Sequence, residues 1–410
     1  MMKLLKVIWR NWVMENNWRR FKLDECTIKI TDGTHSTVKD DNDGDCYLLS
    51  CKNVKDGKIL IGDNERRINK EQLENLRKRT GMQKNDTLIT TVGTIGQSAL
   101  IREKDINYEF QRSVAILRPK TDIINPEYLY YLTKTREFIG QAIGLTSGSV
   151  QKCLFLGNIK EVQVNVPSLK KQEKIVEVIS SLDNKIELNS EMNKTLEEMA
   201  QAIFKSWFVD FEPFKDGEFE ESELGLIPKG WKVCSLKNIC NINMGQSPSS
   251  ETYNEDKEGM SFYQGVKDFT ERFPLVSTYC SAPKKVAMAG DILLSVRAPV
   301  GRINISLEKC CIGRGCASLS SEKYGNGFLY YLLRNIKWDK YESGTVFTSI
   351  KKSDIENYKV ISPNIDVINK FNQIINSLDN RIYNNCVQNR DLENIRDTLL
   401  PKLISGEIEV

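Results

Sequence analysis

Hydrophobic residues recur at helical spacing in two long stretches, from about Ser168 to Phe208 and from about Asn364 to Ile404. The apolar positions of the first stretch are Ile175, Ile179, Leu182, Ile186, Met192, Leu196, Met199 and Ile203. Those of the second are Phe371, Ile375, Leu378, Ile382, Leu392, Ile395 and Leu399. Alternating steps of three and four residues are typical of a coiled-coil seam. We therefore predict two helices of about 40 residues, each about 60 Å long.

A polar residue interrupts the predicted seam at the same place in both helices. Asn189 falls between Ile186 and Met192, and Asn385 lies 196 residues later in the second helix. A polar side chain in a seam costs stability but fixes the register and the number of partners. We expect the two helices to pack antiparallel on each other with these Asn residues in the seam. The alternative is that both Asn residues face solvent at a helix irregularity.

Each helix follows a stretch with shorter elements of mixed type. In the first stretch, "DTLITTVG", "SALI" and "SVAILRP" predict short strands, and a further strand is expected at Ile159 to Val164. The segment "NPEYLYYLTKTREFIGQAI" predicts one helix with Pro126 near its start. The segments "GDILLSVRAPVGRINIS" and "NGFLYYLLRNI" repeat the same order in the second stretch. Each stretch therefore predicts a globular head of mixed α/β structure.

The chain repeats itself over nearly its whole length. Ser181-Leu182-Asp183-Asn184 recurs as Ser377-Leu378-Asp379-Asn380, an offset of 196. Gly96 corresponds to Gly301 at an offset of 205, and Arg112 corresponds to Arg314 at an offset of 202. The predicted fold class is α+β, with two similar mixed α/β domains separated by two long antiparallel coiled-coil helices in a pseudo-two-fold repeat. The expected segments are an N-terminal extension (1–17), a first head (18–167), a central helix (168–210), a linker (211–230), a second head (231–363), and a C-terminal helix and tail (364–410).

Composition narrows the chemistry of the 410-residue chain. Lys plus Arg number 58 and Asp plus Glu 55, so the net charge of +3 excludes a histone-like polycation but allows locally basic faces. The single histidine, His35, excludes a multi-histidine metal site. The eleven cysteines form no C-x-x-C pair, and Cys310, Cys311 and Cys316 lack a second cluster, so free thiols in a reducing compartment are expected.

No apolar run approaches the roughly 18 residues of a membrane span, and the start lacks the features of a signal peptide. We expect a cytoplasmic protein.

Familiar catalytic motifs are missing from the sequence. No proline is followed by Pro or Asp, which excludes the N-P-P-F/Y loop of amino-methyltransferases and the usual start of a nuclease metal site. Gly57-Lys58 is followed by Ile59, so there is no phosphate-binding P-loop, and no G-x-S-x-G occurs. We expect no catalytic residue, metal or cofactor in this chain, and favour a binding or scaffolding protein.

Two related but diverged heads at a fixed separation suit duplex DNA, whose groove repeats geometrically while its sequence differs. The candidate DNA contacts of the first head are Lys52, Arg66, Arg67, Arg112, Ser147, Ser149 and Lys152. Those of the second head are Lys267, Arg297, Arg302, Arg314, Thr345, Thr348 and Lys351. Further cations expected in variable loops include Arg77, Lys78, Arg79 and Arg272. A solvated surface cation is the alternative for each basic residue, and ordinary turns are the alternative for the hydroxyl-rich segments.

Three segments resemble a known family. "VPSLKKQEKIVEVISSLDNKIELN", "AQAIFKSWFVDFEPF" and "LLPKLISGEIEV" are similar to the specificity subunit of type I restriction-modification systems, and the likeness runs from about Trp18 to the end. The resemblance implies two target-recognition domains that each read half of a bipartite, asymmetric site in double-stranded DNA. It implies helices that dock two methyltransferase (modification) subunits, which restriction (ATP-dependent translocase/nuclease) subunits join. Catalysis and S-adenosylmethionine binding would belong to those partners.

The sequence departs from the family pattern in two places. Ile368 stands where the first helix has Gln172, and residues 1–17 have no counterpart in the second repeat. The competing class is a protein-only, two-headed coiled-coil adaptor without DNA sequence recognition. A standalone nuclease or methyltransferase would need an active site that the sequence does not contain.

Overall fold

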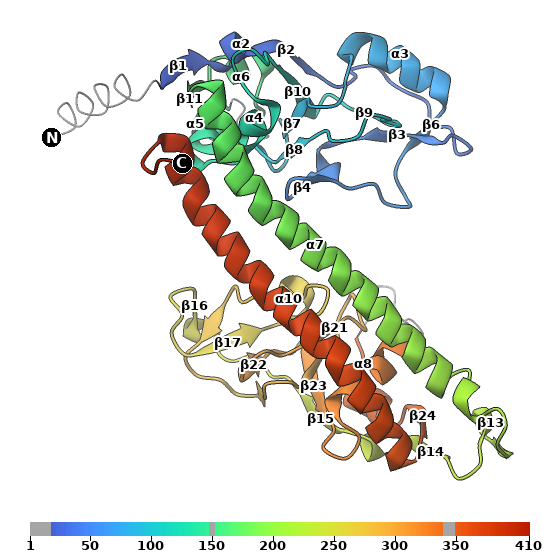
Figure 1. Cartoon of the computed structure of the whole chain (residues 1–410). Coiled ribbons are helices and arrows are strands. Elements are labelled where there is room, and N and C mark those ends of the chain that lie inside the picture. The colour runs from blue at the N-terminus through green and yellow to red at the C-terminus, as the bar shows by residue number, and fades with distance from the viewer. Residues whose placement is uncertain (1–17, 147–151, 339–348) are drawn as a thin grey trace. The chain divides into compact units, whose positions relative to one another are not determined.

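The computed structural model describes residues 18–146, 152–338 and 349–410. The expectations for residues 1–17 and for Ser147, Ser149, Thr345 and Thr348 lie outside these residues. The chain forms two compact units, each with one head (Figure 1). The first unit runs to Leu188 and includes Gln388–Val410, and the second comprises Asn189–Val387.

The head of the first unit is built on an antiparallel four-stranded sheet in the order β2-β10-β7-β8. These strands are β2 (Thr27–Asp32), β7 (Thr87–Thr90), β8 (Ser98–Leu100) and β10 (Val114–Pro119). A three-stranded sheet joins β3 (Cys46–Leu49), β6 (Arg67–Ile68) and β9 (Tyr108–Phe110), with β3 and β9 parallel. Two-stranded pairs join β1 (Arg19–Lys22) to β11 (Gln163–Val166) and β4 (Val54–Lys55) to β5 (Lys58–Ile59). The predicted strand runs "DTLITTVG", "SALI" and "SVAILRP" are thereby confirmed.

The helices of this head differ from the sequence prediction at two points. They are α2 (Leu23–Cys26), η1 (Cys51–Asn53), α3 (Lys70–Thr80), α4 (Pro126–Thr133), α5 (Arg136–Gly144) and α6 (Leu156–Lys160). The single helix predicted after Asn125 is two helices, because the Thr135 side chain caps α5 by accepting a hydrogen bond from Phe138 N–H. The strand expected from Ile159 is wrong at its start, because Ile159 lies in α6 and is fully buried in the core.

The head of the second unit repeats this plan with different sequences. Its four-stranded sheet has the order β15-β23-β20-β21, formed by β15 (Asn241–Met244), β20 (Ile292–Ser295), β21 (Ile303–Ile305) and β23 (Cys316–Ser320). Its other sheet contains β16 (Tyr253–Asn254), β17 (Met260–Tyr263), β18 (Tyr279–Cys280), β19 (Val286–Ala287) and β22 (Cys310–Ile312), with β17 and β22 parallel. The pairs are β14 (Lys232–Ser235) with β24 (Lys359–Ser362), and β12 (Phe219–Ser222) with β13 (Gly225–Pro228). Its helices are η2 (Glu212–Phe214), η3 (Leu236–Asn238), η4 (Ser250–Thr252), η5 (Val266–Asp268), α8 (Asn326–Asn335) and α9 (Lys352–Glu356).

The two long helices are present as predicted, as α7 (Leu169–Phe208) and α10 (Ile365–Ser405). In the first unit, Arg396 Nη1 of α10 donates to Asp183 Oδ1 of α7 at 2.9 Å, and Lys171 Nζ lies 3.2 Å from Glu409 Oε1. Because residues early in α7 meet residues late in the chain, the segments run antiparallel there. In the second unit, Asn385 Nδ2 of α10 donates to Asn193 Oδ1 of α7 at 2.9 Å.

The ends of both helices belong to the cores of the heads and are more than a spacer. In the first unit, Ile175 and Ile179 of α7 and Leu403 of α10 join the hydrophobic core of the first head. In the second unit, Phe204 of α7 and Phe371 of α10 join that of the second, with ring centroids 5.8 Å apart. The sequence pattern assigned Ile175, Ile179 and Phe371 to the seam between the two helices. In the structure these residues, near the helix ends, pack into the cores of the heads.

In the helical pattern, the two seam Asn residues are buried as expected, but two of the expected apolar seam residues are not. Asn189 and Asn385 are buried, at 0% and 4% exposed. Met199 and Ile395, expected in the seam, are 49% and 46% exposed. The buried residue that follows Leu196 on this face of α7 is Ala200, four positions later, and not Met199, three positions later. The Met199 side chain therefore points outward.

The departure at Ile368 is compensated one helical turn later. In the first unit, the side-chain amide of Gln172 donates to Ile123 O at 2.9 Å and accepts from Asn125 N–H at 2.7 Å, which ties α7 to the start of α4. In the second unit, Ile368 is buried in the core. Asn372 donates instead to Tyr324 O at 2.8 Å and accepts from Phe328 N–H at 3.0 Å. In both units, an amide therefore ties the long helix to the start of the head helix that precedes it in the chain, α4 or α8.

Candidate nucleic-acid interface

Backbone hydrogen bonds join several loops of the first head at the ends of its strands. Thr34 N–H donates to Phe110 O at 2.7 Å, and Gln111 N–H donates to Leu49 O at 2.8 Å. Thr91 N–H donates to Ser113 O at 2.9 Å, and Leu154 N–H in turn donates to Thr91 O at 2.9 Å. We call this set the loop network; it comprises residues 33–35, 49–53, 91–96, 111–113 and 152–154. The bonds hold residues far apart in sequence next to one another.

The second head contains the same bonds between corresponding residues. Gln246 N–H donates to Ile312 O at 3.0 Å, and Gly313 N–H donates to Tyr263 O at 2.9 Å. Val296 N–H donates to Gly315 O at 2.9 Å, and Ile350 N–H donates to Val296 O at 2.9 Å. The corresponding loop network comprises residues 245–247, 263–268, 296–301, 313–315 and 349–351. The internal repeat therefore extends to individual backbone bonds, whereas the side chains at the loop tips differ.

Glycines allow the loops to approach each other closely. A Cβ placed on Gly33 would lie 2.0 Å from Phe110 O, and one on Gly245 would lie 2.2 Å from Gly313 O. No side chain fits at those distances, so both positions require glycine. The loop tips are thereby fixed rather than loosely extended.

Most of the predicted DNA contacts are exposed on or beside these loop networks. Arg112 and Arg314 occupy equivalent positions at the tips between β9 and β10 and between β22 and β23. The Arg112 backbone N–H donates to Thr34 O at 3.0 Å, and that of Arg314 donates to Ser247 Oγ at 3.1 Å. The other exposed candidates that belong to or flank the networks are Lys52, Lys152, Lys267, Arg297, Arg302 and Lys351.

Three candidates of the first head are engaged within it. Lys52 Nζ lies 3.0 Å from Glu65 Oε2, although the Lys52 side chain is 65% exposed. Arg66 donates to Asp40 Oδ1 at 2.7 Å and to Val38 O at 2.7 Å. Arg67 lies over the ring of Tyr47 at 5.9 Å from its centroid. These contacts hold the three side chains within the first head.

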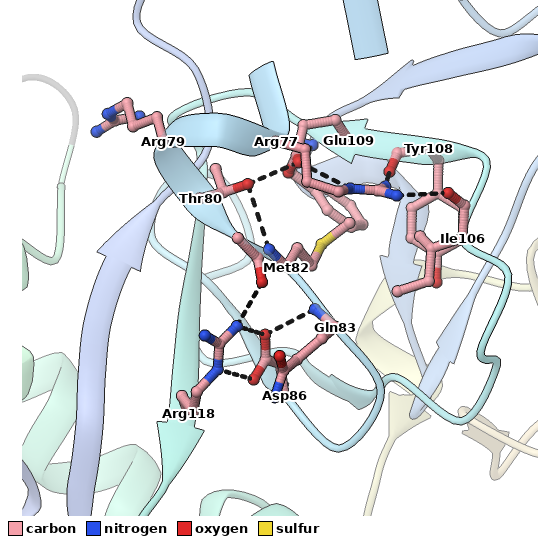
Figure 2. A network of polar contacts seen from close by, with 12 residues as sticks. Arg77, Arg79, Thr80, Met82, Gln83, Asp86, Ile106, Tyr108, Glu109 and Arg118 are labelled. Carbon is pink, nitrogen blue, oxygen red and sulfur yellow. Dashed lines mark hydrogen bonds and ion pairs between the residues drawn. The ribbon is translucent and has the colours of Figure 1, made fainter. Parts of the chain in front are cut away.

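Several arginines are structural, contrary to the expectation that Arg77 and Arg79 lie in variable loops (Figure 2). Both belong to α3, and Arg77 donates to the carbonyl oxygens of Ile106 and Tyr108 at 2.8 and 2.7 Å. Arg118 binds both carboxylate oxygens of the buried Asp86 at 2.9 and 2.7 Å. Arg77 and Arg118 are therefore bound within the head, and counting cations in the sequence overestimates how many are free for a ligand.

A buried carboxylate lies within the same polar network. Glu109 is fully buried, accepts from Thr80 Oγ1 at 2.7 Å and lies 3.8 Å from Arg77 Nε (Figure 2). Burial raises the pKa of Glu109, and the bonds from Thr80 and Phe110 N–H and the charge of Arg77 oppose that rise. The network fixes the end of α3 against β9.

His35 is a candidate that the sequence patterns did not select. Its Nε2 lies 2.6 Å from Oδ2 of the buried Asp32, whose Oδ1 accepts from Arg79 Nη2 at 2.6 Å. The His35 side chain is 55% exposed and follows Thr34, which accepts the bond from Arg112 N–H. Asp32, which Arg79 binds in turn, orients the imidazole at the loop network. The spacing of Asp32 and His35 was visible in the sequence, but Arg79, which completes the set, is 44 residues further on.

In each unit, a tyrosine of the head binds an aspartate of the long helix. Tyr131 donates to Asp183 Oδ2 at 2.9 Å in the first unit, and Tyr331 donates to Asp379 Oδ1 at 2.8 Å in the second. Asp379 also pairs with Arg272, whose Nη2 lies 2.6 Å away, so Arg272 is a buried structural residue and not a loop cation.

Within the described ranges, no group of three or more His, Cys, Asp or Glu side chains is arranged to hold a metal ion. Among the same residues, no helix combines the length and apolarity needed to cross a bilayer.

The duplicated loop networks define a protein with two related recognition heads, and comparisons with known proteins name its family. The model of the type I restriction modification DNA specificity domain matches residues 15–198 and 228–392. The type I restriction enzyme MjaIX specificity subunit of Methanocaldococcus jannaschii is 30% identical over 100% of this chain and 99% of its own length. The putative MjaX specificity subunit of the same organism is 32% identical over 77% of this chain and 76% of its own.

The crystal structure of a type I restriction-modification S subunit from M. genitalium covers 95% of this chain and 96% of its own, with a TM-score of 0.58 at 16% identity. That likeness supports the fold alone. The matched family model and the relatives over the full length show that the chain belongs to the type I restriction-modification DNA specificity family. This membership favours DNA sequence specificity over a protein-only adaptor.

Proposed function

We propose that this chain is the non-catalytic subunit that reads DNA and assembles a type I restriction-modification complex, one head for each half of a bipartite target. The observation that carries the proposal is the loop network, in which four backbone bonds recur in both heads with different residues at the tips. Arg112 N–H binds Thr34, the residue before His35, in the first head, whereas Arg314 N–H binds Ser247 in the second. Equal scaffolds with unequal tips suit two half-sites of different sequence.

The proposal assigns catalysis, S-adenosylmethionine and ATP to partner subunits, and places the complex in the cytoplasm with its double-stranded DNA. The helices α7 and α10 would dock two methyltransferase subunits, which restriction subunits would join. Met199 and Ile395 support two docking faces: they are related by the 196-residue repeat, and both are exposed apolar residues. A single exposed apolar side chain is normal on a protein surface, so the assignment rests on the repeat relation between the two positions.

Replacing either residue should remove one methyltransferase subunit. We expect Met199→Glu and Ile395→Glu each to reduce the assembly from two methyltransferases per chain to one, because a carboxylate cannot be buried unpaired at an apolar contact. Native mass spectrometry of the co-expressed complex measures the stoichiometry. Lys194→Glu, at another exposed position of α7, is the control and should keep both subunits. Two subunits bound to either variant would contradict the assigned faces.

Exchange of one head tests the reading function directly. Arg19 pairs with Val166 in the β1–β11 register, so the termini of residues 18–166 lie side by side and the block can be exchanged as a piece. We expect a chain with another family member's block to methylate a target changed in one half only. Genome-wide methylation mapping in a host that carries the partner subunits provides the measurement. A reproducible target changed in both halves, or in neither, would contradict one head per half-site.

Deletion of residues 168–208 is not a useful test of docking. It removes Ile175 and Ile179 from one core and Phe204 and Phe208 from the other, so loss of assembly would follow from unfolding.

A further inference from the structure

Each head exposes an aliphatic pair in a loop. Leu60 and Ile61 are 47% and 40% exposed in the first head, and Leu275 and Val276 are 55% and 37% exposed in the second. None of the four lies in a helix or a strand. The core of each head therefore leaves a large part of these four apolar side chains open to solvent.

The two pairs occupy equivalent positions. An offset of 215 residues relates Leu60 to Leu275, and it also relates Asn53, the last residue of η1, to Asp268, the last residue of η5. Leu60 N–H donates to Asn53 O at 2.8 Å, and Leu275 N–H donates to Asp268 O at 2.8 Å. The same bond therefore fixes the pair beside a short basic turn in both heads, although the surrounding sequences differ.

Side-chain bonds strengthen the attachment of each loop. The Asn53 amide donates to Leu60 O at 2.8 Å. In the second head, Ser277 Oγ donates to Asp268 Oδ1. Asn53 and Asp268 are both buried, so each pair projects from an anchored base.

The turns that carry the pairs are part of the loop networks. Cys51 N–H, in η1, donates to Ser113 Oγ at 3.0 Å, which places the turn beside Arg112. Gly315 N–H donates to Gln264 O at 3.0 Å, which places Arg314 beside the segment that enters η5. Lys52 and Lys267 are the exposed cations of the two turns. An aliphatic pair thus adjoins cations of the loop network in each head.

Duplex DNA offers few apolar groups to such a side chain. The 5-methyl group of thymine in the major groove is the apolar feature that distinguishes base pairs. The alternative is an apolar wedge that inserts between base steps from the minor groove and partly unstacks them. Ile61 and Val276 are short, β-branched and more than half covered, which favours contact with a methyl group over insertion.

We propose that Leu60–Ile61 and Leu275–Val276 are specificity-determining contacts that recognise thymine methyl groups, one pair in each half of the target. The proposal rests on the proposed DNA-reading function. It assigns to apolar side chains a share of the readout that the exposed arginines and lysines do not provide.

Deoxyuridine, which lacks only the 5-methyl group, is the probe. The assembled complex is titrated with its mapped target duplex, in which thymines of one half are replaced by deoxyuridine. We expect each contacted methyl to be worth about fourfold in affinity, the equivalent of burying one methyl-sized group. The L60A/I61A double variant should lose this sensitivity in one half, and L275A/V276A in the other. Leu226→Ala, on the exposed hairpin strand β13, is the matched control and should keep both.

Several results would overturn the inference. They are equal affinity of the unaltered complex for thymine and deoxyuridine targets, full methyl sensitivity in both double variants, and a target half without any A·T pair. A rise in 2-aminopurine fluorescence on binding that L60A/I61A abolishes without a change in methyl sensitivity would indicate a wedge and also overturn it. Failure of the proposed function is distinguishable, because no reproducible target would be mapped in the first place.

Discussion

Replacement of Arg272 by methionine should lower the free energy of unfolding of the second unit by about 3–5 kcal/mol. The Arg272 side chain is 5% exposed, and its guanidinium pairs with Glu197 of α7 and Asp379 of α10. It also lies 4.4 Å from the ring centroid of Tyr330. Burial opposes the charge, but the interactions with Tyr330 and with the two carboxylates outweigh it and raise the pKa of Arg272. Methionine fills part of the space and leaves both carboxylates without this partner.

Hydrogen exchange resolved by mass spectrometry measures this effect in the full chain. Peptides covering β23 should open more readily in Arg272→Met, whereas peptides covering β10 of the first unit serve as the internal reference. Adding Glu197→Gln and Asp379→Asn removes the unpaired charges and should restore much of the protection. Unchanged exchange at β23 would show that the cluster contributes little. Arg314→Ala, a surface substitution, should leave exchange unaltered.

Arg112→Ala and Arg314→Ala should each weaken specific DNA binding by about 5- to 150-fold, the range of one good bidentate contact to a base. Both side chains are exposed at equivalent tips whose backbones are fixed by hydrogen bonds. Because the two tips belong to different heads, each variant should relax discrimination in a different half of the target.

Selection from duplexes randomised in one half at a time measures that relaxation in the assembled complex. Lys78→Ala removes an exposed cation of α3 outside the loop network and serves as the control. A uniform loss across all sequences, with a weaker salt dependence, would assign the arginines to phosphates instead.

The sequence predicted the elements that depend on local pattern. The spacing of apolar residues predicted α7 and α10 almost to the residue, since a long helix that buries one face must repeat near every 3.6 residues. The short strands near Thr87, Ser98 and Val114 also followed from β-branched runs between turns. The break at Thr135 was missed, because a single capping side chain outweighs a continuous helical pattern there.

The sequence alone determined that the chain is a duplicated pair of heads and long helices, because a repeat is a property of residue order. Only the tertiary structure decided what individual side chains do. In the sequence, Arg77, Arg112, Arg272 and Arg314 are all simply arginines. In the structure Arg77 and Arg272 bind other groups of their own unit, whereas the side chains of Arg112 and Arg314 are exposed. That difference depends on partners such as Tyr108 and Asp379, some 30 to 110 residues away in sequence, and proximity across such separations arises only when the chain folds.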